Sequence, residues 1–160
     1  MNKTKHGFTL VELMIVMILL GILMLAGWVG YGNMRQSALK SSYCNNIRTI
    51  ETAIQAWFND NSVFALTTDK MQEAITAVTA ADSTYISDTV KKNVFTGSPI
   101  KAFSVSGGPT QQPPTNTFDS NIPAGDFSVV IWHGSTDPAG IATQFTMITN
   151  PSCTATTTSP

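Results

Sequence analysis

The stretch Gly7-Phe8-Thr9-Leu10-Val11-Glu12, with the apolar run behind it, decides the organisation of this chain. From Leu13 to Met34 the sequence contains no charged side chain. The run at 13–29 is close to the roughly 20 residues that a helix needs to cross a bilayer core. A carboxylate within such a helix costs about 2.5–3.5 kcal/mol at mid-membrane. Glu12 therefore needs a compensating partner, and we treat it as a candidate functional residue.

Cleavage of the chain between Gly7 and Phe8 would supply such a partner. The freed α-amino group of Phe8 would be largely protonated near neutral pH, because its unperturbed pKa is about 7.7–8.0. It would lie four residues before Glu12 and could pair with the carboxylate of its own chain or of a neighbouring copy. In the second case the charge pair would set the axial register between copies, as a buried polar group does in a coiled coil.

Composition predicts one domain behind an apolar anchor. Of the 160 residues only 12% are charged, and the net charge of −1 indicates no nucleic-acid or anionic-surface partner. Lys3 and Lys5 with no acidic residue beside them place residues 1–7 in the cytoplasm and the head outside. The two cysteines, Cys44 and Cys153, then lie in an oxidising compartment.

The stretch Lys5-His6-Gly7-Phe8-Thr9-Leu10-Val11-Glu12-Leu13 resembles the class III signal of type IV pilins and of the related pseudopilins of type II secretion. The resemblance covers only the N-terminal part of the chain. It implies a prepilin peptidase that removes the leader at residues 1–7 and methylates the Phe8 amine. It also implies that Glu12 meets the Phe8 amine of an adjacent subunit in a homo-oligomeric helical filament. A pilus assembly platform in the inner membrane would build that filament.

Two alternatives exist for the N-terminus. An ordinary secretory signal is one, with Ala26-Gly27 as a small-residue cleavage site. Against it, Glu12 would place a charge in the apolar region, and the run exceeds the usual length of about 7–15 residues. The other alternative is an uncleaved anchor that holds a monomeric periplasmic binding domain.

A single long helix is predicted behind the signal. No proline interrupts residues 8–59, and after Met34 apolar residues recur at three- and four-residue steps. They are Leu39, Tyr43, Ile47, Ile50, Ile54 and either Trp57 or Phe58. We expect residues 8–34 to form a transmembrane and polymerisation segment, apolar all round, and residues 35–160 to form the head.

Three glycines, Gly27, Gly30 and Gly32, make the weakest part of this helix, since each costs about 1 kcal/mol relative to alanine. Many pilins have a proline at the position of Val29, and this chain does not. We predict a hinge at the glycines. The alternative is close helix contact through small residues.

The head is predicted to be α+β. A short helix capped by Thr68 or Asp69 would carry apolar residues on one face, at Met71, Ala74, Ile75 and Val78. A second short helix is expected from Ser87 or Asp88 to Val94. Strands are predicted at 100–106, 127–133 and 141–149. We expect them to form a small antiparallel sheet, compatible with a meander, on the second half of the long helix.

Cys44 and Cys153 are the only possible intrachain disulfide. The bridge would fasten the C-terminal segment to the long helix. The alternative is two free or intermolecular thiols. The final residues, 154–160, are almost all Thr, Ser and Ala and are predicted to be disordered, with O-linked sugar as a further hypothesis.

No catalytic or cofactor-binding constellation is recognisable in the sequence, so no enzymatic activity, cofactor or metal is predicted. The histidines are His6, in the leader, and His133, at a predicted strand end. Related pseudopilins bind calcium through acidic loop residues, but Asp119, Asp126 and Asp137 are too scattered to predict a site.

The prediction is a type IV pilin precursor, single-pass in the bacterial inner membrane before assembly and extracellular in the pilus afterwards. Adhesion, motility, DNA uptake and conjugation are uses that the sequence does not separate. A pseudopilin of type II secretion is the first alternative, and the anchored binding domain is the second.

Overall fold

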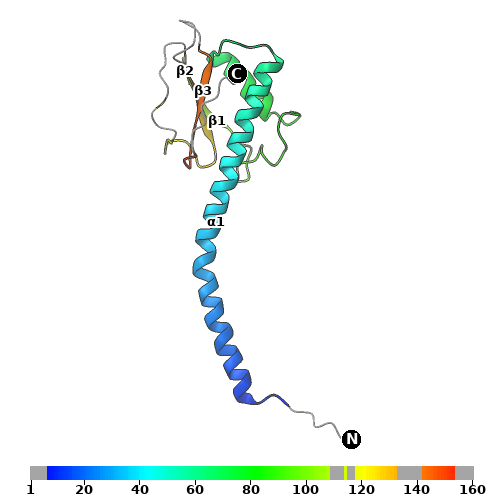
Figure 1. The fold of residues 1–160 in the computed structure, drawn as a ribbon, viewed down its shortest axis with the longest axis vertical. Coiled ribbons are helices and arrows are strands. Elements are labelled where there is room, and N and C mark those ends of the chain that lie inside the picture. Colours follow the sequence, from blue (N-terminus) through cyan, green and yellow to red (C-terminus); the bar gives the residue numbers. More distant parts are fainter. Residues whose placement is uncertain (1–6, 109–113, 115–117, 133–141, 154–160) are drawn as a thin grey trace. The chain divides into compact units, whose positions relative to one another are not determined.

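The computed structural model describes residues 7–108, 114, 118–132 and 142–153, and of residues 26–30 only the backbone. The chain falls into two compact units, Met1–Ala38 and Leu39–Pro160. Its elements follow the order α1 (Leu10–Asp60), α2 (Thr68–Thr79), β1 (Ala102–Gly107), β2 (Phe127–Trp132) and β3 (Gln144–Thr149), as Figure 1 shows. The α+β class is confirmed.

The first unit contains the N-terminal part of α1, which is 51 residues long in all. Every described side chain of the helix up to Ala38 is exposed. The large apolar side chains from Leu10 to Leu25 are 48–76% exposed. Among the described residues, no helix combines the length and the hydropathy needed to cross a membrane. The transmembrane segment at 8–34 therefore stays a prediction.

The second unit contains the C-terminal part of α1, and there the predicted apolar stripe is buried. Its members are Tyr43, Ile47, Ile50, Ile54, Trp57 and Phe58, while Leu39 is half-buried. The Phe58 ring lies 6.3 Å from the ring of Phe145 in β3, so the stripe packs on the sheet. Both aromatic candidates at the end of the stripe are therefore core residues.

Helix α2 is the predicted short helix, with one correction at its start. Thr67, and not Thr68 or Asp69, is the N-cap, because its hydroxyl accepts a hydrogen bond from the Lys70 N–H at 3.2 Å. The predicted apolar face is fully buried, at Met71, Ala74, Ile75 and Val78.

The second short helix, expected from Ser87 or Asp88 to Val94, is absent from the described residues. The chain makes one turn there, in which the N–H groups of Val90 and Lys91 donate to the Ser87 carbonyl. The Asn93 side chain then accepts from the N–H of Phe95 at 2.9 Å. Such local side-chain bonds offer the backbone an alternative to the helical ladder.

The sheet is mixed, which corrects the predicted antiparallel arrangement. Its strand order is β1-β2-β3. Strands β2 and β3 are antiparallel, with Val129 opposite Met147, but β1 and β2 are parallel, with Val105 opposite Val129. Residues 108–126 connect β1 to β2, and a connection of about a dozen residues or more is what a parallel pair needs. The three strands were predicted correctly, but the expected meander was wrong, because β1 and β2 are parallel.

Candidate processing and assembly site

The peptide bond between Gly7 and Phe8 precedes α1 and lies in non-helical chain. Gly7 is exposed, and the Phe8 side chain is 83% exposed. A Cβ built on Gly7 would meet no atom within 4 Å, and its φ is outside the left-handed region. The fold itself therefore has no need of glycine at this position, and the bond is open to a protease.

Thr9 is the residue that positions the start of α1, and sequence reasoning missed it. Its hydroxyl accepts a hydrogen bond from the Glu12 N–H at 3.3 Å, and its carbonyl accepts from the Leu13 N–H at 3.3 Å. A threonine followed three residues later by glutamate, ahead of an apolar run, is the capping-box pattern. That pattern was present in the sequence and could have identified the helix start.

Glu12 lies in the first turn of α1 and is exposed. A carboxylate there interacts favourably with the positive end of the helix dipole. Among the described residues the ion pairs are Lys70–Glu73 and Lys91–Asp88, both in the other unit. Among the described residues, the Glu12 carboxylate thus has no charged partner.

The predicted hinge glycines lie within continuous helix. The backbone of α1 is helical through Gly27, Gly30 and Gly32, and a Cβ on Gly32 would meet no atom within 4 Å. Neither the hinge nor the close-packing alternative is tested by a single chain, and both stay predictions.

Cys44 and Cys153 form a disulfide, with their Cα atoms 5.5 Å apart. The bridge joins the segment that follows β3 to the first turns of α1 in the second unit. Beside it, the buried Tyr43 hydroxyl donates to the Asp126 carbonyl at 2.6 Å. Burial raises the pKa of the Tyr43 hydroxyl above its ordinary value. The predicted cysteine pair therefore lies next to a hydrogen bond that also joins the helix to a distant loop.

Asn93 links its own loop to the loop that precedes β2. It is 4% exposed, and its side-chain amide donates to the Ala124 carbonyl at 2.9 Å and to Asp126 Oδ1 at 3.3 Å. Gly125 has φ +89°, and a Cβ there would overlap the Asn93 side chain. Neither residue was singled out from the sequence, because an isolated Asn and Gly carry no distinctive pattern.

The remaining candidates do not assemble into a site. Asp126 accepts from Asn93, and Asp119 accepts from the Asn121 N–H at 2.8 Å. Within the described ranges no group of three or more metal-ligating side chains occurs. His133, Asp137 and the tail at 154–160 lie outside the described residues.

The chain matches the family model described as the prokaryotic N-terminal methylation motif, over residues 2–28. No curated protein and no solved structure matches it. The motif supports a type IV pilin-like or prepilin-like protein, and it indicates a structural protein of the pilin type. It implies processing by prepilin peptidase, a precursor anchored in the inner membrane, and later assembly into a pilus-type filament.

Proposed function

We propose that the chain is a structural subunit of a type IV pilus, cut between Gly7 and Phe8 and N-methylated on Phe8. The observation that carries the proposal is the uncovered apolar helix at Leu10–Leu25, headed by one carboxylate at Glu12. Apolar side chains exposed to this extent are stable in water only when lipid or other chains cover them. Copies of the same helix would supply that cover in a filament core.

Glu12 has the role of a register residue in this proposal. The protonated amine of Phe8 on one subunit would pair with the Glu12 carboxylate of its neighbour and neutralise it within the apolar core. Because a wrong axial position would leave both charges unpaired in a low-dielectric environment, the pair selects one register.

The first test is the intact mass and the N-terminal sequence of protein from a sheared-filament fraction. A subunit that begins at Phe8 and carries one extra methyl group, about 14 Da, would support processing, methylation and export together. A chain that begins at Met1, or one that is missing from sheared material, would contradict the proposal. That result would favour the anchored binding domain.

The second test separates the charge of Glu12 from its place in the capping box. Glu12→Gln keeps the capping pattern but removes the charge, whereas Thr9→Ala removes the hydroxyl that accepts from the Glu12 N–H. We expect Glu12→Gln to be cut normally but to abolish filaments, and Thr9→Ala to weaken them only partly. Normal filament yield from Glu12→Gln would rule out the register role.

A pseudopilin of type II secretion is the second candidate, because the methylation motif supports either kind of protein. Deletion of the gene separates the two. Loss of surface filaments with normal protein secretion indicates a pilin, and loss of secretion without loss of surface filaments indicates a pseudopilin. The structure supplies no argument for adhesion, motility, DNA uptake or conjugation in particular.

A further inference from the structure

The second unit carries exposed charges of opposite sign at its two ends. Exposed lysines gather where α1 enters the unit, and we call them the basic surface: Lys40, Lys92 and Lys101. Exposed acids gather where α1 ends, and we call them the acidic surface: Asp60, Asp69 and Glu73.

The contacts around Tyr43 place the basic surface. Lys92 directly precedes Asn93 and lies three positions before Phe95, whose ring is 5.8 Å from that of Tyr43. The Lys101 N–H donates to Asp126 Oδ1 at 3.2 Å, and the Tyr43 hydroxyl donates to the carbonyl of the same aspartate. Lys40 lies one turn earlier on α1. All three lysines therefore belong to the Tyr43 end of the unit.

The end of α1 places the acidic surface. Asp60 is the last residue of the helix and accepts a hydrogen bond from the Tyr85 hydroxyl at 2.9 Å. Asp69 is in the first turn of α2, which begins shortly afterwards at Thr68. At 1.5 Å per residue, Tyr43 and Asp60 are about 25 Å apart along the helix axis.

A concave surface accompanies the acids. A groove of about 530 Å³ runs along α2, and it is lined by Asp69, Gln72, Glu73, Thr76, Ala77 and Ala80. Lys70 lies beside these acids in the sequence, and it pairs with Glu73 at 2.8 Å on the exposed face. Two carboxylates that line an open groove suit the long, cationic side chain of a lysine.

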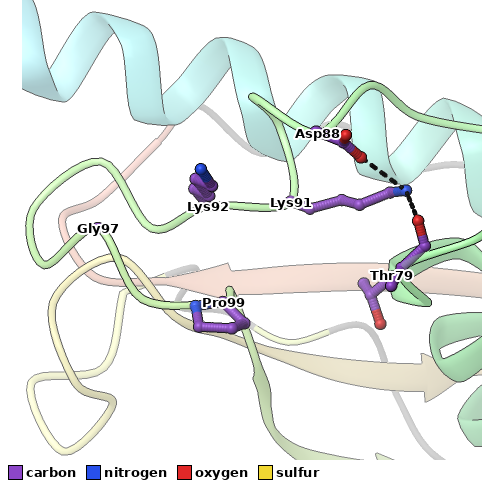
Figure 2. Close-up of a pocket in the computed structure, with 7 residues that line it drawn as sticks. Thr79, Asp88, Lys91, Lys92, Gly97 and Pro99 are labelled. Carbon is purple, nitrogen blue, oxygen red and sulfur yellow. Dashed lines mark hydrogen bonds and ion pairs between the residues drawn. The ribbon is translucent and has the colours of Figure 1, made fainter.

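Lys91, which is next to Lys92 in the chain, is already used internally. The Lys91 side chain is only 11% exposed, and its Nζ donates to the carbonyls of Ala81 and Ser83 and pairs with Asp88. Figure 2 shows Lys91 extended toward Asp88, whereas Lys92 points in a different direction. Lys91 therefore closes its own loop, and Lys92 remains available to a partner.

We propose that the basic surface of one copy binds the acidic surface of the next copy, in a head-to-tail contact. This inference rests on the proposed function and names a second contact beyond the Phe8–Glu12 pair. A contact between two different surfaces does not close on itself unless the rotation forms a ring, so it propagates as an open helical assembly. The chain's net charge of −1 leaves little overall repulsion to oppose it.

Charge reversal tests the contact in the full-length chain. One variant carries Lys92→Glu and Lys101→Glu, and a second carries Asp60→Lys and Asp69→Lys. Each variant alone would place like charges across every contact. We expect each to lower the yield of sheared filaments about tenfold, and more at low salt, where screening is weak. Co-expression of the two variants, or all four changes in one chain, restores complementary contacts and should restore the yield.

Lys70→Glu is the matched control, because it is also a charge reversal but leaves the acidic surface more acidic. It should keep the wild-type yield. Wild-type yield from both double variants would overturn the contact, and so would loss in both without rescue by their combination. Such a result leaves the proposed function intact if the wild-type chain forms filaments and Glu12→Gln abolishes them. Absence of wild-type filaments would instead contradict the proposed function itself.

Discussion

The two parts of α1 differ in how their apolar side chains are arranged and covered. In Leu39–Asp60 the apolar side chains form a stripe that the rest of the second unit covers, so that Ile50 and Ile54 have no exposed surface. In Leu10–Ala38 apolar residues occur all round the helix, and Ile18 is 59% exposed. A one-sided stripe indicates a helix that its own chain can bury, and an all-round apolar helix indicates one that other molecules must cover. One helix thus contains both a segment that stabilises the fold and a segment that other molecules must cover.

The disulfide should give the largest effect on the self-covered part. Replacing Cys44 and Cys153 by serine opens a loop with a sequence separation of 109 residues. The free energy of unfolding of the second unit should fall by about 4–5 kcal/mol, on the loop-entropy estimate. Guanidinium unfolding of the processed chain in detergent, followed by tryptophan fluorescence, measures it. Wild type under reducing conditions is the matched control and should behave like the variant. Equal stability with and without the bridge would contradict the prediction.

A pair of isoleucines on the same helix tests the comparison directly. Ile54→Ala removes a fully buried side chain and should lower the free energy of unfolding by about 2–5 kcal/mol. Ile18→Ala should leave that quantity within about 0.5 kcal/mol of wild type, but it should reduce the filament yield. Denaturant unfolding and shearing assays on both variants provide the measurements. If Ile18→Ala destabilised the second unit, the two parts of α1 would not be independent.

Local patterns were sufficient for α1, for α2 and for the positions of the strands, but they also predicted a short helix at 87–94 that the described residues do not contain. The stripe from Tyr43 to Phe58 and the apolar face of α2 follow from spacing alone, and the run at 127–132 is fully buried as a central strand. The parallel pairing of β1 with β2 was not predictable in the same way. It depends on how residues 108–126 cross back along the sheet, and short-range periodicity says nothing about that path.

The residues of the candidate site also fall into two groups, those that a local pattern identifies and those that depend on contacts between distant segments. Gly7, Phe8 and Glu12 were predicted because a processing signal is read as linear sequence. Asn93 and Gly125 were missed because their importance comes from a contact between loops that lie 32 positions apart in the chain. The Thr9 cap was also present as a local pattern, but it was not predicted.

Substitution of Gly125 should have the next largest effect on the stability of the second unit. Its φ of +89° disfavours any side chain, and a Cβ there would overlap the Asn93 side chain. Gly125→Ala should therefore lower the free energy of unfolding by about 3 kcal/mol, from backbone strain and from broken Asn93 hydrogen bonds. Gly97→Ala is the matched control, because Gly97 has φ +72° but open space around it. It should cost only about 1–2 kcal/mol. Equal losses in a thermal unfolding experiment would remove the special role of the Asn93 contact.

Tyr43 should give the smallest effect, and one that depends on pH. Tyr43→Phe removes the hydrogen bond to the Asp126 carbonyl and should cost about 1 kcal/mol at neutral pH. Because burial raises the pKa of the folded-state hydroxyl, the folded chain holds this proton more tightly than the unfolded chain, whose tyrosine pKa is about 10. The stabilisation is therefore complete below about pH 10 and declines as the pH rises beyond it. Phenylalanine has no proton to lose, so the stability difference between wild type and variant should shrink as the pH rises above about 10. Tyr31→Phe, at a side chain 72% exposed in the first unit, is the matched control and should leave the stability of the second unit unchanged. If the free energy of unfolding depended on pH in the same way in wild type and in Tyr43→Phe, the prediction would be wrong, and the buried hydroxyl would not stabilise the second unit through its raised pKa.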